Sequence, residues 1–366
     1  MLERRAAITL SNVLLVVTVG LLLVLVWQLR WLVIILMVAV VMAATIAPII
    51  DSAAKFNIPR WVAAIAVYLG LVGLFIGAAL LIGPTVATQI HRLVTNFPLY
   101  IETLRSLIAN FTANSNTEQP EFIRQLFDPQ SLTNWAIRSS QQLLLRSYGI
   151  TKDIIGGVLS AILALLISGY MVADSENLVQ GIVKLFPAPW DKRLEAQVTP
   201  VSLRMGRYIQ GRILVSAILG VAITIGLSFL GMSEFALGLG VIAGFTDLIP
   251  FFGPILGAVP ALIVAVSLGG WTFLWTLLLF VIIQNLETYV LDPLLVGSSV
   301  KIQPLYQLLA VLGGTQVLGI VGALIVPPWI AGASVLVENL YLIPKLEAEK
   351  PEIIAEFSPS DAVLKK

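Results

Sequence analysis

Residues 246–260 read TDLIPFFGPILGAVP, an apolar run that contains one carboxylate, three prolines and two glycines. A carboxylate near the centre of a bilayer costs roughly 2.5–3.5 kcal/mol, so a charge in such a run usually has a function. The prolines interrupt a helix, the glycines let another backbone approach closely, and the freed carbonyl groups need protein partners or a water-filled cavity. We therefore expect a broken helix at a substrate-binding site formed by Asp247, Pro250, Gly253, Pro254 and Gly257, with Pro260 in a structural role.

Asp247 supplies the negative charge of this candidate site, so it can bind a cation or carry a proton. The alternative is a structural kink at which Asp247 caps a helix end or lies at the membrane surface. Small-residue pairs at GxxxG spacing, Gly240 with Gly244 and Gly253 with Gly257, predict close helix packing in lipid. The packing partner is either the other half of the same apolar stretch or a neighbouring subunit.

The composition of the chain favours a membrane as its solvent. Hydrophobic residues make up 58% and charged residues 12% of the 366 residues, against about 45–50% and about 25% in soluble domains. A net charge of +1 without a basic stripe argues against nucleic acid as a partner. The sequence contains no cysteine and no GxxxxGK[ST], HExxH or GxSxG motif. We therefore expect no metal site, no cofactor and no enzymatic activity.

Uncharged apolar windows of about 19 residues mark the candidate membrane helices. Each window is near the length needed to cross about 30 Å of hydrocarbon at about 1.5 Å per residue. The first follows MLERR, as in a signal peptide, but it runs long and lacks a small-residue cleavage site, so we interpret it as a retained anchor. The six windows are residues 11–29, 31–50, 61–82, 154–173, 213–230 and 271–286.

Two longer apolar stretches, residues 236–268 and 305–337, are each interrupted near the middle, by IPFFGP and by LGGTQVLG. Folded once, each stretch gives arms of about 16 residues, or about 24 Å, which is marginal for two full crossings. We predict re-entrant helical hairpins, with Gly313 and Gly314 at the second break. Pairs of short spanning helices, or one long kinked helix each, are the alternatives. The predicted fold class is an all-α polytopic membrane protein of about eight membrane segments, including one or two re-entrant hairpins.

Lysines and arginines near the helix ends predict the orientation. They concentrate at the start of the chain, between the second and third windows, and in the connector after the fourth window, so we place these three parts in the cytoplasm. Turn formers at residues 112–120 interrupt the long polar segment. Four parts follow: the first three membrane helices in residues 1–82, a polar helical extracytoplasmic segment in 83–153, the membrane transport region in 154–344 and a cytoplasmic tail in 345–366.

Polar residues at two further helix ends complete the candidate site. Gln284, Asn285 and Glu287 can bind a polar solute or hold a mobile hairpin through interhelical hydrogen bonds. The alternative is a helix end that meets cytoplasmic water. Gln210 and Arg212 lie where the cytoplasmic connector enters the membrane. We expect Arg212 to extend toward lipid headgroups, and a gating role is the alternative.

Three ordered runs carry a family resemblance, YIQGRILVSAILGVAITIGLSFLGMSEFALGLGVIAGFTDLIPFFGPILGAVPALIVA, QNLETYVLDPLLVGSSVKIQPLYQLLAVLGG and GIVGALIVPP. Together they resemble the autoinducer-2 exporter family of bacterial membrane proteins. The resemblance implies the same layout of membrane segments, cytoplasmic termini, a long loop after the third helix and movement of small solutes out of the cell. It also implies roles for Gln284, Glu287 and Pro293. Asp292 departs from the pattern, because a small neutral residue is expected there.

Three functions fit these features. The first is a secondary transporter that moves a small polar or amphiphilic solute out of the cell by alternating access, as the resemblance implies. The second is a sodium–proton antiporter that uses the same carboxylate, and the third is a non-transporting membrane scaffold or regulator. We expect the lipid bilayer, a small polar solute and H+ or Na+ as partners. We also expect a homo-oligomer of undetermined stoichiometry in a bacterial cytoplasmic (inner) membrane.

Overall fold

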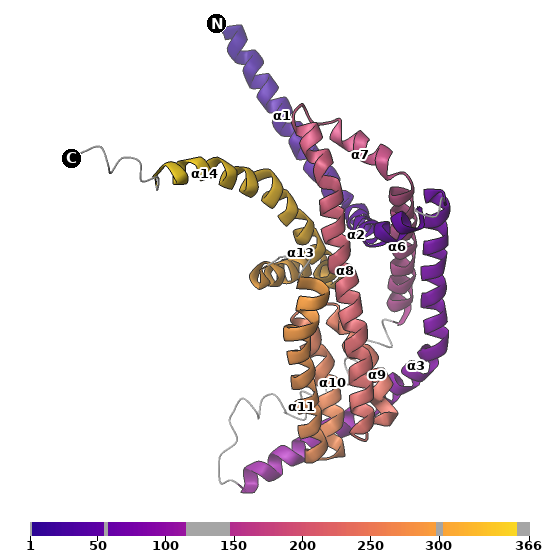
Figure 1. The fold of residues 1–366 in the computed structure, drawn as a ribbon. Helices are drawn as coiled ribbons and strands as arrows, with labels where there is room; N and C mark the ends of the chain where they lie inside the picture. Colours follow the sequence, from indigo (N-terminus) through magenta and orange to yellow (C-terminus); the bar gives the residue numbers. More distant parts are fainter. Residues whose placement is uncertain (1, 55–57, 115–146, 298–302, 357–366) are drawn as a thin grey trace, which may run out of the picture.

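The computed structural model describes residues 2–54, 58–114, 147–297 and 303–356, and within these ranges the chain is helical, with no strand. Figure 1 shows the long helix α8 at the centre of the molecule, with the other helices arranged around it. Residues 115–146 of the predicted polar segment and residues 357–366 of the predicted tail lie outside the described residues. The elements are α1 (Leu2–Gln28), α2 (Arg30–Ala54), α3 (Arg60–Asn114), α6 (Ser147–Ala173), α7 (Ser175–Val183), α8 (Trp190–Phe229), α9 (Ser233–Asp247), α10 (Phe252–Leu268), α11 (Gly270–Leu286), η1 (Glu287–Gly297), α13 (Pro304–Val337), η2 (Glu338–Leu342) and α14 (Ile343–Glu356).

Six helical segments in the described ranges are long and apolar enough to cross a membrane. This confirms the prediction of an all-α polytopic membrane protein, while the number of membrane segments and the re-entrant hairpins stay predictions. Two further apolar helices, Asn12–Leu22 and Phe252–Leu268, are shorter. The six candidate spans are Arg30–Ala53, Arg60–Tyr100, Gly156–Ala173, Trp190–Phe229, Gly270–Gly297 and Pro304–Glu349.

Helix α3 continues through the position where the sequence predicts a change from membrane helix to polar segment. It runs for 55 residues and contains Pro84 and Pro98, residues that interrupt the helical hydrogen bonding, and Figure 1 shows it bending along its length toward α9. Gln89 Oε1 accepts a hydrogen bond from the backbone N–H of Gly238 at 2.6 Å. The Tyr100 ring meets Phe235 edge to face, with 6.4 Å between the ring centroids. The second half of α3 therefore packs on the hairpin that contains the candidate site.

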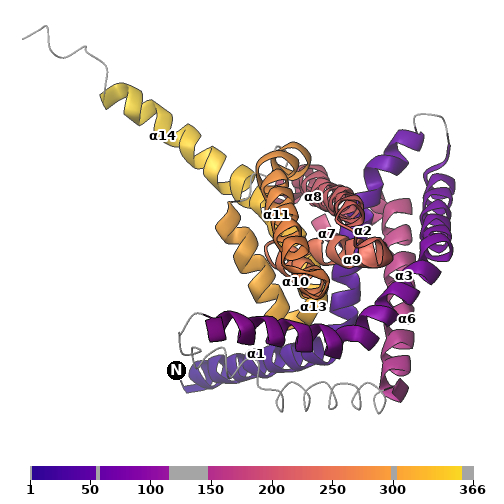
Figure 2. The same cartoon turned by 90° about the horizontal axis from the view of Figure 1, so that it is seen from below.

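Helix α8 is 40 residues long and contacts most of the C-terminal half of the structure. Viewed along its length in Figure 2, it lies beside α9 and α11, with α2 on another side. Glycines allow its closest contacts: a Cβ atom added at Gly206 would lie 2.9 Å from the carbonyl carbon of Ala44 in α2. One added at Gly211 would lie 3.0 Å from the carbonyl carbon of Leu295 in η1. The main apolar core lies where α8 meets the hairpin, and it includes Val215, Leu219, Leu227, Leu239, Val264 and Ala265.

The predicted hairpin at residues 236–268 is present as two packed helices, α9 and α10, joined by residues 248–251. The turn ends at Phe251, whose φ of 67° lies in the left-handed region. Gly257 faces α9, since an added Cβ would lie 2.7 Å from Ala243 Cα. Gly244 faces α8 instead, since its added Cβ would lie 3.1 Å from Gly220 Cα. One GxxxG pair therefore packs on the partner arm, and the other packs on α8, a partner that the sequence did not indicate.

The second predicted hairpin, at residues 305–337, corresponds to α13, which consists of two helices joined at Gly319. Gly319 has φ 66° and ψ −152°, a conformation that favours glycine. The chain folds tightly there, because a Cβ added at Gly314 would lie 2.8 Å from the carbonyl carbon of Gly322. Gly313 faces open space. Of the two predicted glycines, Gly314 therefore makes the close contact.

Candidate transport site

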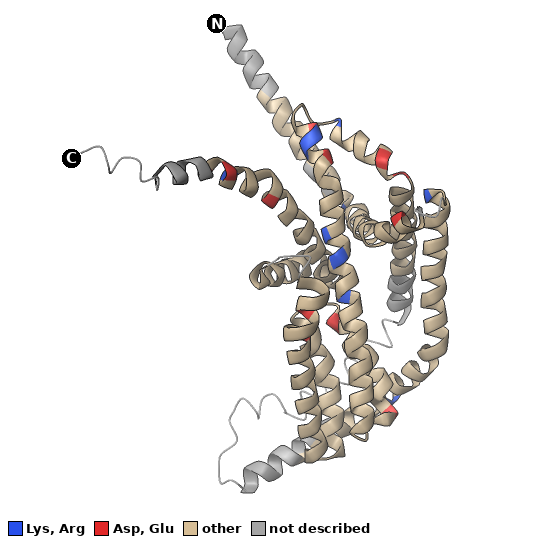
Figure 3. Cartoon of the chain, viewed as in Figure 1, with Lys and Arg blue, Asp and Glu red and all other residues tan. Residues whose placement is uncertain are grey.

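Charged side chains meet inside the helical bundle, where the composition would lead one to expect only apolar groups. Figure 3 shows charged segments gathered toward the two ends of the molecule, and one further group on α8, α9 and the junction of α11 with η1. The central group comprises Arg212, Asp247 and Glu287, which are 3%, 3% and 4% exposed. Removing an ion from water costs several kcal/mol, so such groups are retained only when they are paired and hydrogen-bonded.

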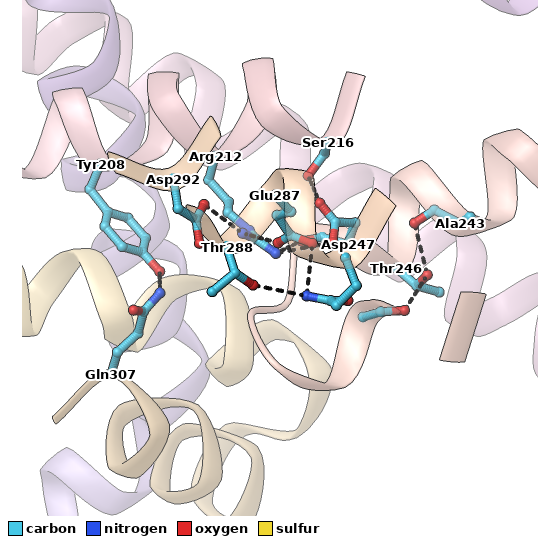
Figure 4. A network of polar contacts seen from close by, with 12 residues as sticks. Tyr208, Arg212, Ser216, Ala243, Thr246, Asp247, Glu287, Thr288, Asp292 and Gln307 are labelled. Atoms are coloured by element: carbon cyan, nitrogen blue, oxygen red, sulfur yellow. Dashed lines mark hydrogen bonds and ion pairs between the residues drawn. The ribbon is translucent and has the colours of Figure 1, made fainter. Parts of the chain in front are cut away.

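The guanidinium of Arg212 is the centre of this ionic cluster (Figure 4). Its Nη1 lies 2.9 Å from Glu287 Oε1, and its Nη2 lies 3.2 Å from Asp247 Oδ1. Nη2 also donates to the backbone carbonyl of Asp247, and Nη1 lies 3.4 Å from Asp292 Oδ1. A single side chain of α8 therefore connects the tip of the α9–α10 hairpin to η1. The expectation that Arg212 extends to lipid headgroups is wrong, because its guanidinium is buried among carboxylates.

The carboxylates have additional partners that hold them in place. Ser216 Oγ donates to Asp247 Oδ2 at 3.1 Å, and Gln284 Nε2 donates to Glu287 Oε2 at 3.3 Å. Asp247 is the last residue of α9, and α10 begins after Phe251 without a side-chain cap. The alternative in which Asp247 caps a helix end therefore does not describe this structure. Its carboxylate contacts Arg212 and Ser216 instead.

The hairpin turn is held by its own polar contacts. Thr246 Oγ1 lies 3.0 Å from the carbonyl oxygens of both Ala243 and Gly253, so it bridges the two arms. Pro250 is buried within the turn. Gly253 must be small, because an added Cβ would lie 2.5 Å from Asp247 Cα. The proline and glycine residues of the quoted run thus place the Asp247 carboxylate beside α8.

A cavity of about 590 Å³ opens beside the cluster, and a much smaller one of about 20 Å³ lies on its apolar side. Gln284 and Glu287 line both cavities, whereas Asp247 lines only the small one, which has room for about one water molecule. The lining of the large cavity combines hydroxyl, amide, guanidinium and carboxylate groups with apolar side chains. Its lining residues are Tyr208, Arg212, Pro250, Phe251, Gln284, Glu287, Thr288, Asp292, Pro293, Val296, Gly297, Pro304 and Gln307.

The structure brings most of the predicted site residues together but separates a few from the rest. Asn285 is exposed and donates to the carbonyl of Val281, so it does not join the cluster. Gln210 donates to the carbonyl of Thr45 at 2.7 Å and holds α8 to α2. Pro260 lies within α10, half-buried and outside both cavities. The predicted site residues that line a cavity are Asp247, Pro250, Pro254, Gln284, Glu287, Arg212 and Pro293.

Several polar residues of the site were not recognised from the sequence. Tyr208 and Ser216 lie four residues before and after Arg212 on α8, and this spacing places all three on one helix face. Gln307 Nε2 donates to Tyr208 Oη at 3.1 Å and joins α13 to that face. Asp292 was noted only as a departure from the family pattern. Within the described ranges, no three His, Cys, Asp or Glu side chains are grouped as ligands of a metal ion.

The fold and the site define a class of protein. Buried charges, a helix broken by prolines and glycines, and a polar cavity among membrane-spanning helices are together typical of membrane transport proteins. The chain belongs to the AI-2E family of transporters, because the model of that family, described as AI-2E family transporter, matches residues 14–342. This membership supports a role in membrane transport.

Similar proteins occur in distant bacteria. The chain is 31% identical over 329 residues to the candidate transport protein YrrI of Bacillus subtilis, a match that covers 86% of this chain and 90% of that protein. It is 28% identical to a second such protein, YueF, of the same organism, with 79% of each chain covered. The candidate transport protein MT0215 of Mycobacterium tuberculosis is 26% identical, with 81% of this chain and 79% of that protein covered.

Proposed function

We propose that this protein is a secondary transporter that moves a small polar solute out of the cell by alternating access, with the large cavity as the solute site. The observation that carries the proposal is the buried Arg212, which joins Asp247 at the hairpin tip to Glu287 at the start of η1 beside that cavity. A purely structural bundle gains little from such a cluster, because apolar side chains of similar volume would fill the space with equal or greater stability.

The cluster suggests how a solute or proton would be coupled to movement. Breaking one partner away from a buried ion pair costs about 3–5 kcal/mol, because an uncompensated charge remains. The hairpin tip can therefore leave Arg212 only when another group replaces it, or when a proton neutralises the carboxylate. Binding in the cavity would supply that replacement, and a ligand shifts a conformational equilibrium only through such a difference in affinity between two states.

Sodium–proton antiport is the second candidate function. The observation that favours it is the excess of carboxylates at the cluster, where Asp247, Glu287 and Asp292 all approach the single guanidinium of Arg212. An excess of oxygen ligands with negative charge suits a hard cation or a transferable proton. Sodium-stimulated proton movement across sealed vesicles separates this function from export of a neutral solute.

Flux measurements in reconstituted vesicles test the proposal. The purified chain is placed in liposomes with imposed proton or sodium gradients, and uptake of a panel of small polar solutes and movement of protons are recorded. We expect flux with the unchanged chain and only the background of empty vesicles with Asp247→Asn, which keeps the side-chain volume. Glu234→Gln is the matched control, because Glu234 is on the same helix but its side chain is 74% exposed. Full activity of Asp247→Asn, or no flux for any solute or ion, would contradict the proposal.

The location and orientation are also part of the proposal: the bacterial cytoplasmic membrane, with both termini in the cytoplasm. Ion pairs gather where the sequence predicts cytoplasmic connectors, with Arg60 at 2.7 Å from Asp51 and 3.3 Å from Glu176. Arg204, in the predicted cytoplasmic connector on α8, pairs with Glu338 of η2 at 2.8 Å. Reporter fusions at each terminus test the orientation, and an external terminus would refute it. A homo-oligomer stays a proposal, testable by the mass of the detergent-solubilised particle.

A further inference from the structure

Carboxylates outnumber cationic side chains among the described residues that line the large cavity. Among the described residues that line it, Arg212 is the only cationic side chain, whereas Glu287 and Asp292 both contribute carboxylates. Asp247 adds a third carboxylate on the far side of the same guanidinium. When all are ionised, three negative groups face one positive group, and a formal charge of −2 remains. The cluster is therefore not balanced by the residues that form it.

Asp292 is the least engaged of the three carboxylates. Its side chain is 40% exposed, against 4% for Asp247 and 5% for Glu287. Its one contact with Arg212 is long, at 3.4 Å, whereas the ion pair of Glu287 measures 2.9 Å. Figure 4 shows Asp292 and Asp247 approaching the guanidinium from opposite sides. Of the two carboxylates that line the cavity, Asp292 is therefore the one whose charge Arg212 compensates less.

The cluster also contains an unused donor. Arg212 is 3% exposed and lines the cavity, yet its Nε–H has no acceptor among the residues that the structure describes. Buried donors in proteins almost always find a partner, and each exception calls for an explanation. The spare carboxylate suits a positively charged group, whereas the spare Nε–H needs a hydrogen-bond acceptor, such as a water molecule or a second group of the same solute.

We infer that Asp292 determines charge selectivity: it makes the cavity prefer solutes with a positive charge, such as a small molecule bearing an ammonium group, to neutral or anionic ones. The inference rests on the proposed function, in which this cavity binds the solute. A unit charge about 6 Å from the carboxylate is favoured about threefold even at the dielectric constant of water, and an anion is disfavoured to the same extent. The effect increases in a cavity shielded from bulk water.

The absence of cysteine from the sequence allows the charge of the cavity to be measured directly. Thr288→Cys places one thiol on the cavity wall, four positions before Asp292 in η1. Its modification rate is measured with a cationic, a neutral and an anionic methanethiosulfonate reagent at low ionic strength. The ratio of the cationic to the anionic rate is used, because a change in the thiolate fraction affects both rates equally and cancels.

With Asp292 present, we expect the cationic reagent to react faster, and we expect Asp292→Asn to lower the ratio about tenfold, since both rates shift about threefold in opposite directions. Asp292→Glu keeps the charge and should keep the ratio. Glu234→Gln removes a carboxylate at the far end of α9 and should leave the ratio unchanged. The difference should shrink near 1 M salt, where charges are screened within about 3 Å.

Two results would overturn the inference. One is a ratio that changes less than twofold when Asp292→Asn is added to Thr288→Cys. The other is a Thr288→Cys protein with Asp292 in place that reacts faster with the anionic reagent. The neutral reagent reports whether a variant has altered access to the thiol, and Asp292→Glu reports whether charge or shape is responsible. The rates are measured without any transport, so they are independent of the proposed function. Absence of flux would contradict transport and leave the charge measurement intact, whereas an unchanged ratio with normal flux would remove only the role of Asp292.

Discussion

Replacing Arg212 by methionine should destabilise the protein strongly, because the change removes the only guanidinium from a group of buried carboxylates. Methionine fills a similar volume without charge. Asp247 and Glu287 are 3% and 4% exposed and keep their hydrogen bonds from Ser216 and Gln284, but these neutral donors do not balance two negative charges. Breaking a buried pair in this way costs about 3–5 kcal/mol. Hydrophobic packing at the site contributes less to the change, because the side-chain volume is nearly conserved.

The compensating experiment removes the two carboxylates as well. Asp247→Asn and Glu287→Gln, combined with Arg212→Met, leave only the part-exposed Asp292 charged in the cluster. Neutralising the buried partners together avoids the cost of an uncompensated buried charge. We therefore expect the triple variant to recover most of the stability that Arg212→Met loses. The three single changes should be far from additive, since residues that share one network couple by about 0.5–3 kcal/mol.

Unfolding of the purified protein in mixed dodecylmaltoside and SDS micelles measures these effects, with the fluorescence of its 8 tryptophans as the signal. The unfolding midpoint of Arg212→Met should fall well below that of the unchanged chain, and the midpoint of the triple variant should lie near it. An Arg212→Met midpoint equal to that of the unchanged chain would refute the argument. So would additive effects of the three changes, because both results would mean that the ion pairs carry no mutual energy.

Three further changes test the packing of the fold in the same unfolding assay. Gly257→Ala should destabilise by about 1–3 kcal/mol through overpacking against α9, whereas Gly313→Ala, which meets open space, should be nearly neutral; equal effects would contradict the contact. Tyr68→Phe should cost about 1–3 kcal/mol, because it leaves the fully buried Ser168 hydroxyl on α6 without its partner, and a neutral outcome would count against that bond. Gly319→Ala should cost about 1–3 kcal/mol, since its φ of 66° and ψ of −152° disfavour a side chain; no loss there would argue against the sharp fold within α13.

Hydropathy predicted the helices and the membrane setting, because apolar composition over about 19 residues is a local property. The carboxylate of Asp247 was found for a similar reason, since one charge in an apolar run is visible without any knowledge of the fold. The contacts of Arg212 were not predictable in this way. Its partners lie 35 and 75 residues further along the chain, and only the packing of α8 against the hairpin and η1 brings them together.

The error over Arg212 also has a local cause. The apolar window begins at residue 213, so the charge appeared to mark a helix end at the membrane surface. In the structure α8 begins at Trp190, which places Arg212 about 33 Å along the helix at about 1.5 Å per residue. The face formed by Tyr208, Arg212 and Ser216 could have been recognised from its spacing of four, had the helix been extended backward through the polar connector. A hydropathy window ends at the first charged residues, whereas α8 continues through them back to Trp190.

Stability and transport can be separated at this cluster, and the same triple variant does so. If the ionic cluster only braced the fold, neutral replacements that restore the unfolding midpoint should also restore whatever flux the protein supports. If the cluster acts in transport, the triple variant should be as stable as the unchanged chain and yet show only background flux, because the hairpin tip then has no ion pair for a solute or proton to release. The second outcome is the one that we expect, since a brace needs balanced charges and this cluster has three carboxylates for one guanidinium.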